Sequence, residues 1–288
     1  MSIPTLSAVV ERFVAQTSGL NDEQLNLPWA WGSYTSEGVR FAYFRILEEL
    51  LLLGVRLQQA RADSDQPLTT AQRILGQYHT TFRDLEAVLL GLSPVESEQR
   101  PGPEEWAVRQ AAAHITNADV TFFAILSLTL KRIRAGQEPP QSLPDGIWDP
   151  LVDMPILEFD KMLEGPMEPL RAFHRTFHSR VLKGLADASD EELSTPSYFW
   201  EDTPMPIRFR LGRFESHCRQ HLIQIEKTRN AIGRPLSEAQ ILGRALYQAL
   251  AAVEATEIGE WNAPTALLEP TKNEINMYAS EVMAIVNA

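Results

Sequence analysis

GRFESHCRQHLIQIEKTR, residues 212–229, has the pattern of one continuous helix and carries two histidines, His217 and His221. Because these residues are four positions apart, both imidazoles lie on one helix face, one turn apart. Two neutral imidazoles so placed can bind one divalent metal ion. A third histidine, His114, lies in a second helical segment, EEWAVRQAAAHITNADVTFF at 104–123. A fold that packs these two segments side by side would complete a three-histidine site.

Apolar residues recur with helical periodicity over most of the chain, and no stretch alternates apolar and polar residues as a strand does. The sequence therefore predicts an all-α protein. We expect helices at 37–62, 69–92, 104–135, 167–187, 208–231, about 236–257 and 270–286. The links at 136–166 and 188–207 are too long for a simple up-down bundle, so the pattern favours a crossover four-helix bundle.

The expected domain organisation has three parts. The bundle occupies residues 66–233, preceded by an N-terminal helical extension at 1–65 and followed by a C-terminal helical extension at 234–288. We expect the long link at 136–166 and the aromatic residues Tyr198, Phe199 and Trp200 to form pocket walls near the metal site.

Two parts of the chain resemble each other. WGSYTSEGVRFAYFRILEELLLLG at 31–54 has the layout of WEDTPMPIRFRLGRFESHCRQHLIQ at 200–224, and QPLTTAQRILG at 66–76 resembles RPLSEAQILG at 234–243. With an offset of about 170 residues, Leu47 and Leu51 would correspond to His217 and His221. The similarity is either a true repeat or a coincidence, because amphipathic helices resemble one another.

Composition excludes several classes of protein. The formal net charge is −12, which opposes binding to nucleic acid. The single cysteine, Cys218, rules out an intrachain disulfide and suits a cytoplasmic compartment. The N-terminus lacks the pattern of a secretory signal, and the longest apolar run, LLLLGV at 50–55, is too short to cross a membrane.

Other residues compete for the role of ligand. His174 and His178 have the same spacing as the first pair, but they flank the apolar stripe of their helix, and we expect them at its boundary or in solvent. His79 is a weaker candidate, which would contact the metal-binding side chains rather than the metal itself. Cys218 points away from the shared histidine face and should lie in the core. A fourth ligand, from Glu215 or Asp119, stays possible.

The segments EEWAVRQAAAHITNAD and FESHCRQHLIQIEK resemble the second and fourth helices of DinB-like (DinB/YfiT) proteins. In that family a tryptophan opens the second helix, a histidine follows about two turns later, and the fourth helix carries a pair of histidines. The resemblance covers roughly residues 69–231 and implies a crossover bundle, often dimeric. It also implies that His114, His217 and His221 are the ligands of a divalent metal.

Two functions fit these observations. The first is a metal-dependent enzyme, a thiol S-transferase, isomerase or hydrolase, in which an open coordination position activates a low-molecular-weight thiol or a water. The second is a non-catalytic metal-binding or assembly protein with a structural metal. Imidazole ligands suit zinc, nickel, copper or iron, and we place zinc and nickel first. We expect a small-molecule substrate, no nucleic acid and no membrane as partners, and a homodimer as one possible assembly; the catalytic residues are unknown.

Overall fold

Helix ends in this chain follow from local residue chemistry. Ser237 caps the helix α12 (Glu238–Glu254): its hydroxyl accepts a hydrogen bond from the backbone of Gln240, whose side chain accepts one from the backbone of Ser237. Gly136 and Gly233 end two other helices in the left-handed conformation, at φ +68° and +73°. Glycine adopts this conformation without steric cost, which explains why these helices end there.

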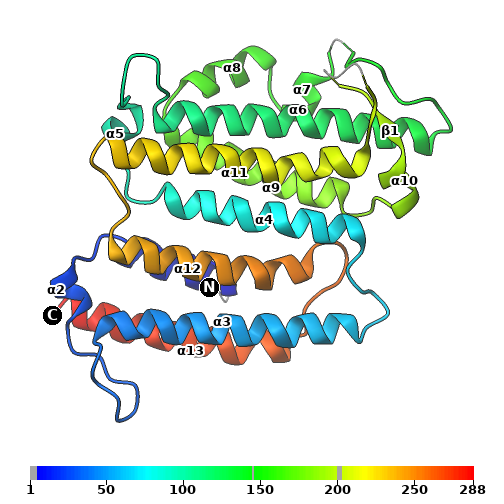
Figure 1. Ribbon diagram of the computed structural model, residues 1–288. Helices are drawn as coiled ribbons and strands as arrows, with labels where there is room; N and C mark the ends of the chain where they lie inside the picture. The colour runs from blue at the N-terminus through cyan, green and yellow to red at the C-terminus, as the bar shows by residue number, and fades with distance from the viewer. Residues whose placement is uncertain (1–4, 145, 200–202) are drawn as a thin grey trace. The chain divides into compact units, whose positions relative to one another are not determined.

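The structure, a computed structural model, describes residues 5–144, 146–199 and 203–288. These residues form thirteen α-helices, one short 3-10 helix and one small sheet. Figure 1 shows how the helices are arranged within the chain. The strands β1 (Pro196–Ser197) and β2 (Met205–Pro206) are two residues each and pair antiparallel. The all-α prediction is confirmed.

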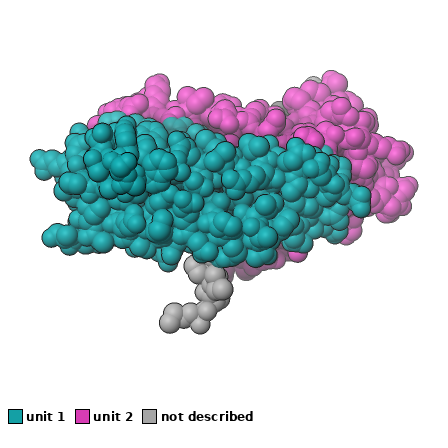
Figure 2. All heavy atoms as spheres, turned by 90° about the horizontal axis from the view of Figure 1, so that it is seen from below, with its two compact units in different colours: residues 1–68, 82–91, 235–288 teal, residues 69–81, 92–234 magenta. Residues whose placement is uncertain are grey.

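Residue contacts divide the chain into two units (Figure 2). Unit 2 comprises residues 69–81 and 92–234. Its elements besides the sheet are the first part of α4 (Thr70–Val88), α5 (Pro94–Glu98), α6 (Val108–Arg134), α7 (Trp148–Val152), α8 (Ile156–Glu164), α9 (Met167–Leu185), α10 (Asp190–Ser194) and α11 (Ile207–Ala231). α6 packs against both α9 and α11. The ring of Tyr78 in α4 lies 4.6 Å from that of His178 in α9 and 5.0 Å from that of Phe214 in α11, so the four long helices share a core.

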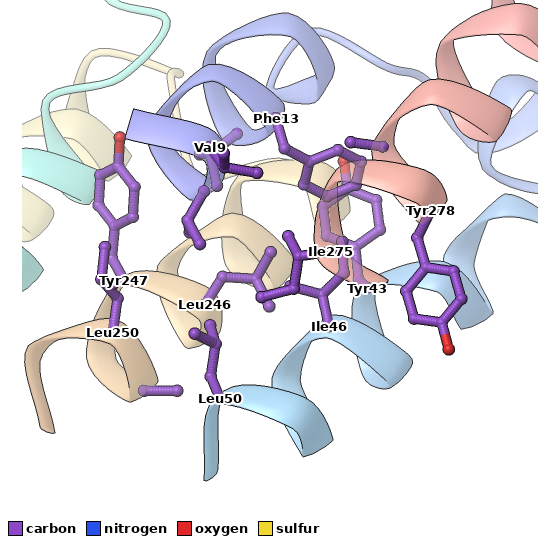
Figure 3. Close-up of a cluster of buried hydrophobic side chains, with 14 of the residues drawn as sticks. Val9, Phe13, Tyr43, Ile46, Leu50, Leu246, Tyr247, Leu250, Ile275 and Tyr278 are labelled. Atoms are coloured by element: carbon purple, nitrogen blue, oxygen red, sulfur yellow. The ribbon is translucent and has the colours of Figure 1, made fainter. Parts of the chain in front are cut away.

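Unit 1 comprises residues 1–68, 82–91 and 235–288. Its elements besides the end of α4 are α1 (Leu6–Thr17), α2 (Asp22–Leu25), α3 (Val39–Ala62), α12, the 3-10 helix η1 (Ala255–Glu257) and α13 (Thr265–Val286). α3 packs against α12 and α13, and α1 packs against the same two helices. Their apolar faces meet around Phe13, Tyr43, Leu246 and Ile275 (Figure 3). The two ends of the chain therefore share one core.

Several helices differ from the prediction: α1, α2, α5 and α10 were not predicted, and α13 begins at Thr265 rather than at 270. α6 begins at Val108, so Glu104 and Glu105 precede the helix, and the side chain of Gln110 accepts the hydrogen bond of Ala107 N at its start. α4 ends at Val88, ahead of Gly91. The link at 136–166 is not irregular throughout, because α7 and α8 lie within it and contact α6. Prolines at 140, 144, 150, 155 and 166 keep these helices short.

α6 is also the one helix of the described residues that is long and apolar enough to span a membrane. Of the 18 residues in its most apolar stretch, however, 67% are buried inside the protein. This burial is typical of the central helix of a bundle, and the packing of α6 against α9 and α11 accounts for its composition.

Candidate metal centre

α6 and α11 bring three histidines together. His114 projects from α6, and His217 and His221 project from α11 one turn apart. One nitrogen of each imidazole lies within 4.8 Å of the other two, and the Nε2 atoms of His114 and His217 are 3.2 Å apart. Two nitrogens that bind one tetrahedral ion, at about 2.0–2.1 Å each, are separated by roughly 3.3 Å. The spacing of the three imidazoles therefore fits a single metal ion.

Neighbouring side chains orient the rings. The Nδ1 atom of His221 lies 2.8 Å from Oε1 of Gln224, which directs the other ring nitrogen, Nε2, toward the cluster. The Trp106 ring stacks on His221 with an interplanar angle of 17°. Phe122 meets the His217 ring edge-on at 5.6 Å. The rotation of two imidazoles is thus restricted before any ligand binds.

One polar atom of the cluster has no partner. Nδ1 of His217 is buried and makes no hydrogen bond within the described residues. A buried polar atom without a partner costs free energy, and such atoms often mark functional positions. The cost here is consistent with a cluster selected for binding rather than for stability alone.

The imidazoles of His217 and His114 are neutral near pH 7. Burial is the largest cause that lowers the pKa of His217 to about 4, and the neighbouring His221, His114 and Arg213 contribute to the same shift. Burial also lowers the pKa of His114, with a second contribution from His221. Neutral imidazole is the form that binds metals, so protons do not compete for these nitrogens at physiological pH.

The two carboxylates considered as a fourth ligand are engaged elsewhere. Oδ2 of Asp119 accepts a hydrogen bond from Tyr78 Oη at 2.5 Å and lies 2.8 Å from Nε2 of His174. Glu215 pairs with Arg219 and accepts a hydrogen bond from Thr81. Among the described residues, the group that can hold an ion contains histidines alone. A tetrahedral ion bound by these three histidines would keep one coordination position for an external ligand.

The second histidine pair does not behave as predicted. His174 and His178 are buried, 5% and 3% exposed, rather than placed at a boundary or in solvent. His174 pairs with Asp119, and Nε2 of His178 lies 2.9 Å from Nδ1 of His79. The prediction was wrong because α4 and α6 supply polar partners to α9. A hydrogen bond with a polar partner offsets most of the free-energy cost of burying an imidazole. His79 thus belongs to this second cluster.

Cys218 is fully buried, as predicted, and outside the histidine group. Its neighbours in α11, His217 and His221, face α6, whereas the thiol lies close enough to Tyr78 of α4 to affect its ionisation. The charge that a Cys218 thiolate would carry raises the pKa of Tyr78, although burial is the largest cause. The sequence-based placement of this residue in the core is confirmed.

Among the pockets that the described residues form, two are lined by residues of unit 2. The first, of about 200 Å³, is lined in part by Trp106 and Gln224, both of which contact His221. The second, of about 310 Å³, is lined by Ile125, residues 140–143, Tyr198 and Phe199. Part of the long link and two of the three expected aromatic residues therefore line a pocket, while Trp200 lies outside the described residues. The Phe122 ring contacts both Phe199 and His217, which places it between this second pocket and the histidines.

Comparison with known proteins identifies a matching family. The family model of the DinB superfamily matches residues 77–225, a little over half of the chain. This range includes His114, His217 and His221 and most of the two helices that carry them. No curated protein and no solved structure matches the chain.

Proposed function

Because the chain belongs to the DinB superfamily, we propose that His114, His217 and His221 bind one divalent metal ion and that the protein is a metal-dependent enzyme. Zinc or nickel is the expected ion, since both accept imidazole ligands. The proposed reaction is transfer to or from a low-molecular-weight thiol, isomerisation with such a thiol, or hydrolysis. The observation that carries the proposal is a group of three imidazoles without a carboxylate.

The donor set favours catalysis over a purely structural role. Structural zinc sites usually have four protein ligands, whereas catalytic sites have three and leave one position open. A divalent ion held by three neutral ligands keeps its full charge, which lowers the pKa of a bound water or thiol to near neutrality. Gln224 and Trp106 hold His221 in place, and Phe122 supports His217, so the protein supplies a fixed set of donors.

The expected partner is a small molecule. The pockets next to Trp106 and beyond Phe122, of about 200 and 310 Å³, have the size to hold parts of a substrate rather than a macromolecule. A net charge of −12 disfavours nucleic acid. We also propose a cytoplasmic location and a homodimeric assembly. Light scattering would measure the molar mass of the assembly.

Metal analysis tests the binding step. Protein purified without added metal or a metal-binding tag should contain about one metal ion per chain by elemental analysis. His114→Ala, His217→Ala and His221→Ala should each lose it. His174→Ala and His178→Ala provide a matched pair of controls with the same i, i+4 spacing, and both should keep it. Equal loss from the control pair, with the fold intact by circular dichroism, would contradict the assignment.

Cobalt substitution separates the enzyme from the alternative, a non-catalytic protein with a structural metal. The visible spectrum of cobalt reports its ligands, so a small thiol that binds at an open position should change the spectrum saturably and add sulfur-to-cobalt charge transfer. Azide should bind at the same position and compete. A spectrum that responds to neither thiols nor azide would mean a closed site and favour the structural role.

A further inference from the structure

The similarity between two parts of the sequence extends through the structure at a constant offset in residue number. Three helices of the first part and their counterparts begin at positions separated by this same offset: α2 at Asp22 and α10 at Asp190, α3 at Val39 and α11 at Ile207, α4 at Thr70 and α12 at Glu238. The spacings between the starts of these helices are therefore equal in the two parts. Amphipathic periodicity alone does not fix such spacings, so coincidence does not explain this agreement.

Helix caps recur in the same register. Asn21 and Gln24 form a capping box at the start of α2, as Ser189 and Glu192 do at the start of α10. Thr69 and Gln72 form reciprocal hydrogen bonds at the start of α4, like those of Ser237 and Gln240 at the start of α12. Each of these four pairs of positions has the offset of the helix starts.

Two hydrogen bonds outside regular helices also recur. Val39 N donates to Leu27 O at 2.9 Å, and at the equivalent positions Ile207 N donates to Thr195 O at 3.0 Å. The buried Arg61 donates from Nε to Gln66 O at 3.0 Å. Its counterpart Arg229, also buried, donates from Nε to Arg234 O at 3.0 Å. A buried arginine bonded to the loop that follows its helix is a specific feature, and finding it twice in register supports a repeat.

Burial follows the same offset. Nine buried positions of α11 correspond to nine buried positions of α3: Ile207, Arg210, Leu211, Phe214, Cys218, His221, Leu222, Ile225 and Arg229 to Val39, Ala42, Tyr43, Ile46, Leu50, Leu53, Gly54, Leu57 and Arg61. Five buried positions of α9 correspond likewise to α1: His174, Phe177, His178, Val181 and Leu185 to Leu6, Val9, Val10, Phe13 and Thr17. The same faces of corresponding helices therefore point inward.

The two units arrange these helices in the same order. In unit 2, α4 and α6 each pack against both α9 and α11. In unit 1, α12 and α13 each pack against both α1 and α3. Since α12 corresponds to α4, α1 to α9 and α3 to α11, α13 takes the place of α6. Unit 1 is thus assembled from the helices at the two ends of the chain into the same kind of bundle.

We propose that unit 1 is a second copy of the metal-binding bundle and holds a latent metal position at Glu49, Leu53 and Glu274. In the structural register, Glu49 and Leu53 of α3 correspond to His217 and His221 of α11. The sequence-based assignment of Leu47 and Leu51 was two residues out of register. Leu51 is 51% exposed, whereas Leu53 is fully buried on the inner face of α3.

Glu49 lies on α3 and Glu274 on α13, the helix that takes the place of α6. Burial raises the pKa of Glu49, and the charge of Glu274 raises it further. Arg45, which corresponds to Arg213, lies 3.0 Å from Glu49, and Tyr278 Oη donates to Glu274 at 2.6 Å. The carboxylate of Glu49 is thus satisfied by an ion pair with Arg45, and that of Glu274 by a hydrogen bond from Tyr278.

Restoring the imidazoles tests this inference, which rests in part on the metal site proposed for unit 2. The variant Glu49→His/Leu53→His/Glu274→His should bind one metal equivalent more than the unaltered chain by elemental analysis and zinc titration. The matched control, Leu47→His/Leu51→His/Glu274→His, has the same residue types and spacing in the rejected register and should gain none. Because the readout is the increment, it does not depend on whether unit 2 binds metal: failure of the proposed function would appear as zero metal in the unaltered chain.

Leu53 is fully buried, so the triple variant could fail to fold. A second variant that leaves Leu53 unchanged avoids this problem. Glu49→His/Glu274→His keeps Leu53, changes partly exposed positions and should bind nickel more weakly through two imidazoles. Leu47→His/Glu274→His is its control. No added metal in either designed variant, with the helical circular dichroism signal retained by the double variant, would overturn the inference. Equal gains in the designed and control variants would overturn it as well.

Discussion

The pKa of His217 makes the stability of metal-free unit 2 depend on pH. In the unfolded chain this histidine takes up a proton as the pH falls through about 6.5, whereas in the folded unit it stays neutral until about pH 4. Between these values the unfolded state binds more protons than the folded state. Stability therefore falls as the pH falls, and it is unaffected by this group above about pH 7.

The magnitude follows from the two pKa values. At pH 5 the difference contributes roughly 2 kcal/mol of destabilisation, and near pH 7 almost none, because each unit of pKa shift corresponds to about 1.4 kcal/mol. This destabilisation is an upper bound, since His217 is 8% exposed and solvent screens its charge. A bound metal ion should remove most of the effect down to the pH at which it dissociates.

Amide hydrogen exchange in α6 and α11 of the metal-free protein measures this directly, because it reports the opening free energy of unit 2 alone. The comparison is with His217→Gln, which has a polar side chain without a titratable group. Between pH 7 and pH 5 the unaltered protein should lose about 2 kcal/mol more than this variant, once rates are corrected for intrinsic exchange. Equal losses in the two proteins would refute the assignment of the pH dependence to His217.

Three further predictions concern neighbouring side chains. Gln224→Ala should weaken zinc binding by about tenfold in a competition titration, because His221 loses the hydrogen bond that orients it. Asp119→Asn should destabilise unit 2 by about 2–3 kcal/mol in urea denaturation, since an amide weakens the buried hydrogen bonds with Tyr78 and His174, while the metal content stays at one. Gly184→Ala should destabilise it by about 1–3 kcal/mol, because the added Cβ would lie 2.9 Å from the Phe123 ring; a neutral effect would mean that the ring moves aside.

The seven longest helices besides α1 could be predicted from the sequence because their apolar periodicity is strong and local, whereas α1 and the short helices α2, α5 and α10 were not predicted. The start of α6 could not, because Glu104 and Glu105 satisfy the general preference for acidic residues at a helix start, yet the turn that contains Pro103 delays the helix to Val108. α7 and α8 were missed for a related reason. Their prolines suggest an irregular link, although Pro155 precedes the first residue of α8 and is compatible with a helix there.

The three candidate ligands could be proposed from spacing and family resemblance, and the structure brings them together. The second cluster was missed because its partners come from three helices. No local pattern in the sequence indicates that Asp119 lies beside His174, or His79 beside His178. The register of the repeat was misassigned over α3, although the similar segments 66–76 and 234–243 have the same offset as the helix starts; burial and loop hydrogen bonds fix it.

Equivalent positions of the two units differ in the charges that surround them. In unit 1, the positive charge of Arg45 is matched by Glu49, four residues later in α3. In unit 2, burial is the largest cause that lowers the pKa of His217, and the charge of Arg213, the counterpart of Arg45, lowers it further. A nearby positive charge opposes binding of a bare cation but favours an anionic ligand on the bound ion, such as a thiolate or hydroxide. In the proposed function, an anion on the bound metal would therefore be favoured by Arg213, and both the proposed thiol transfer and the proposed hydrolysis would use such an anion.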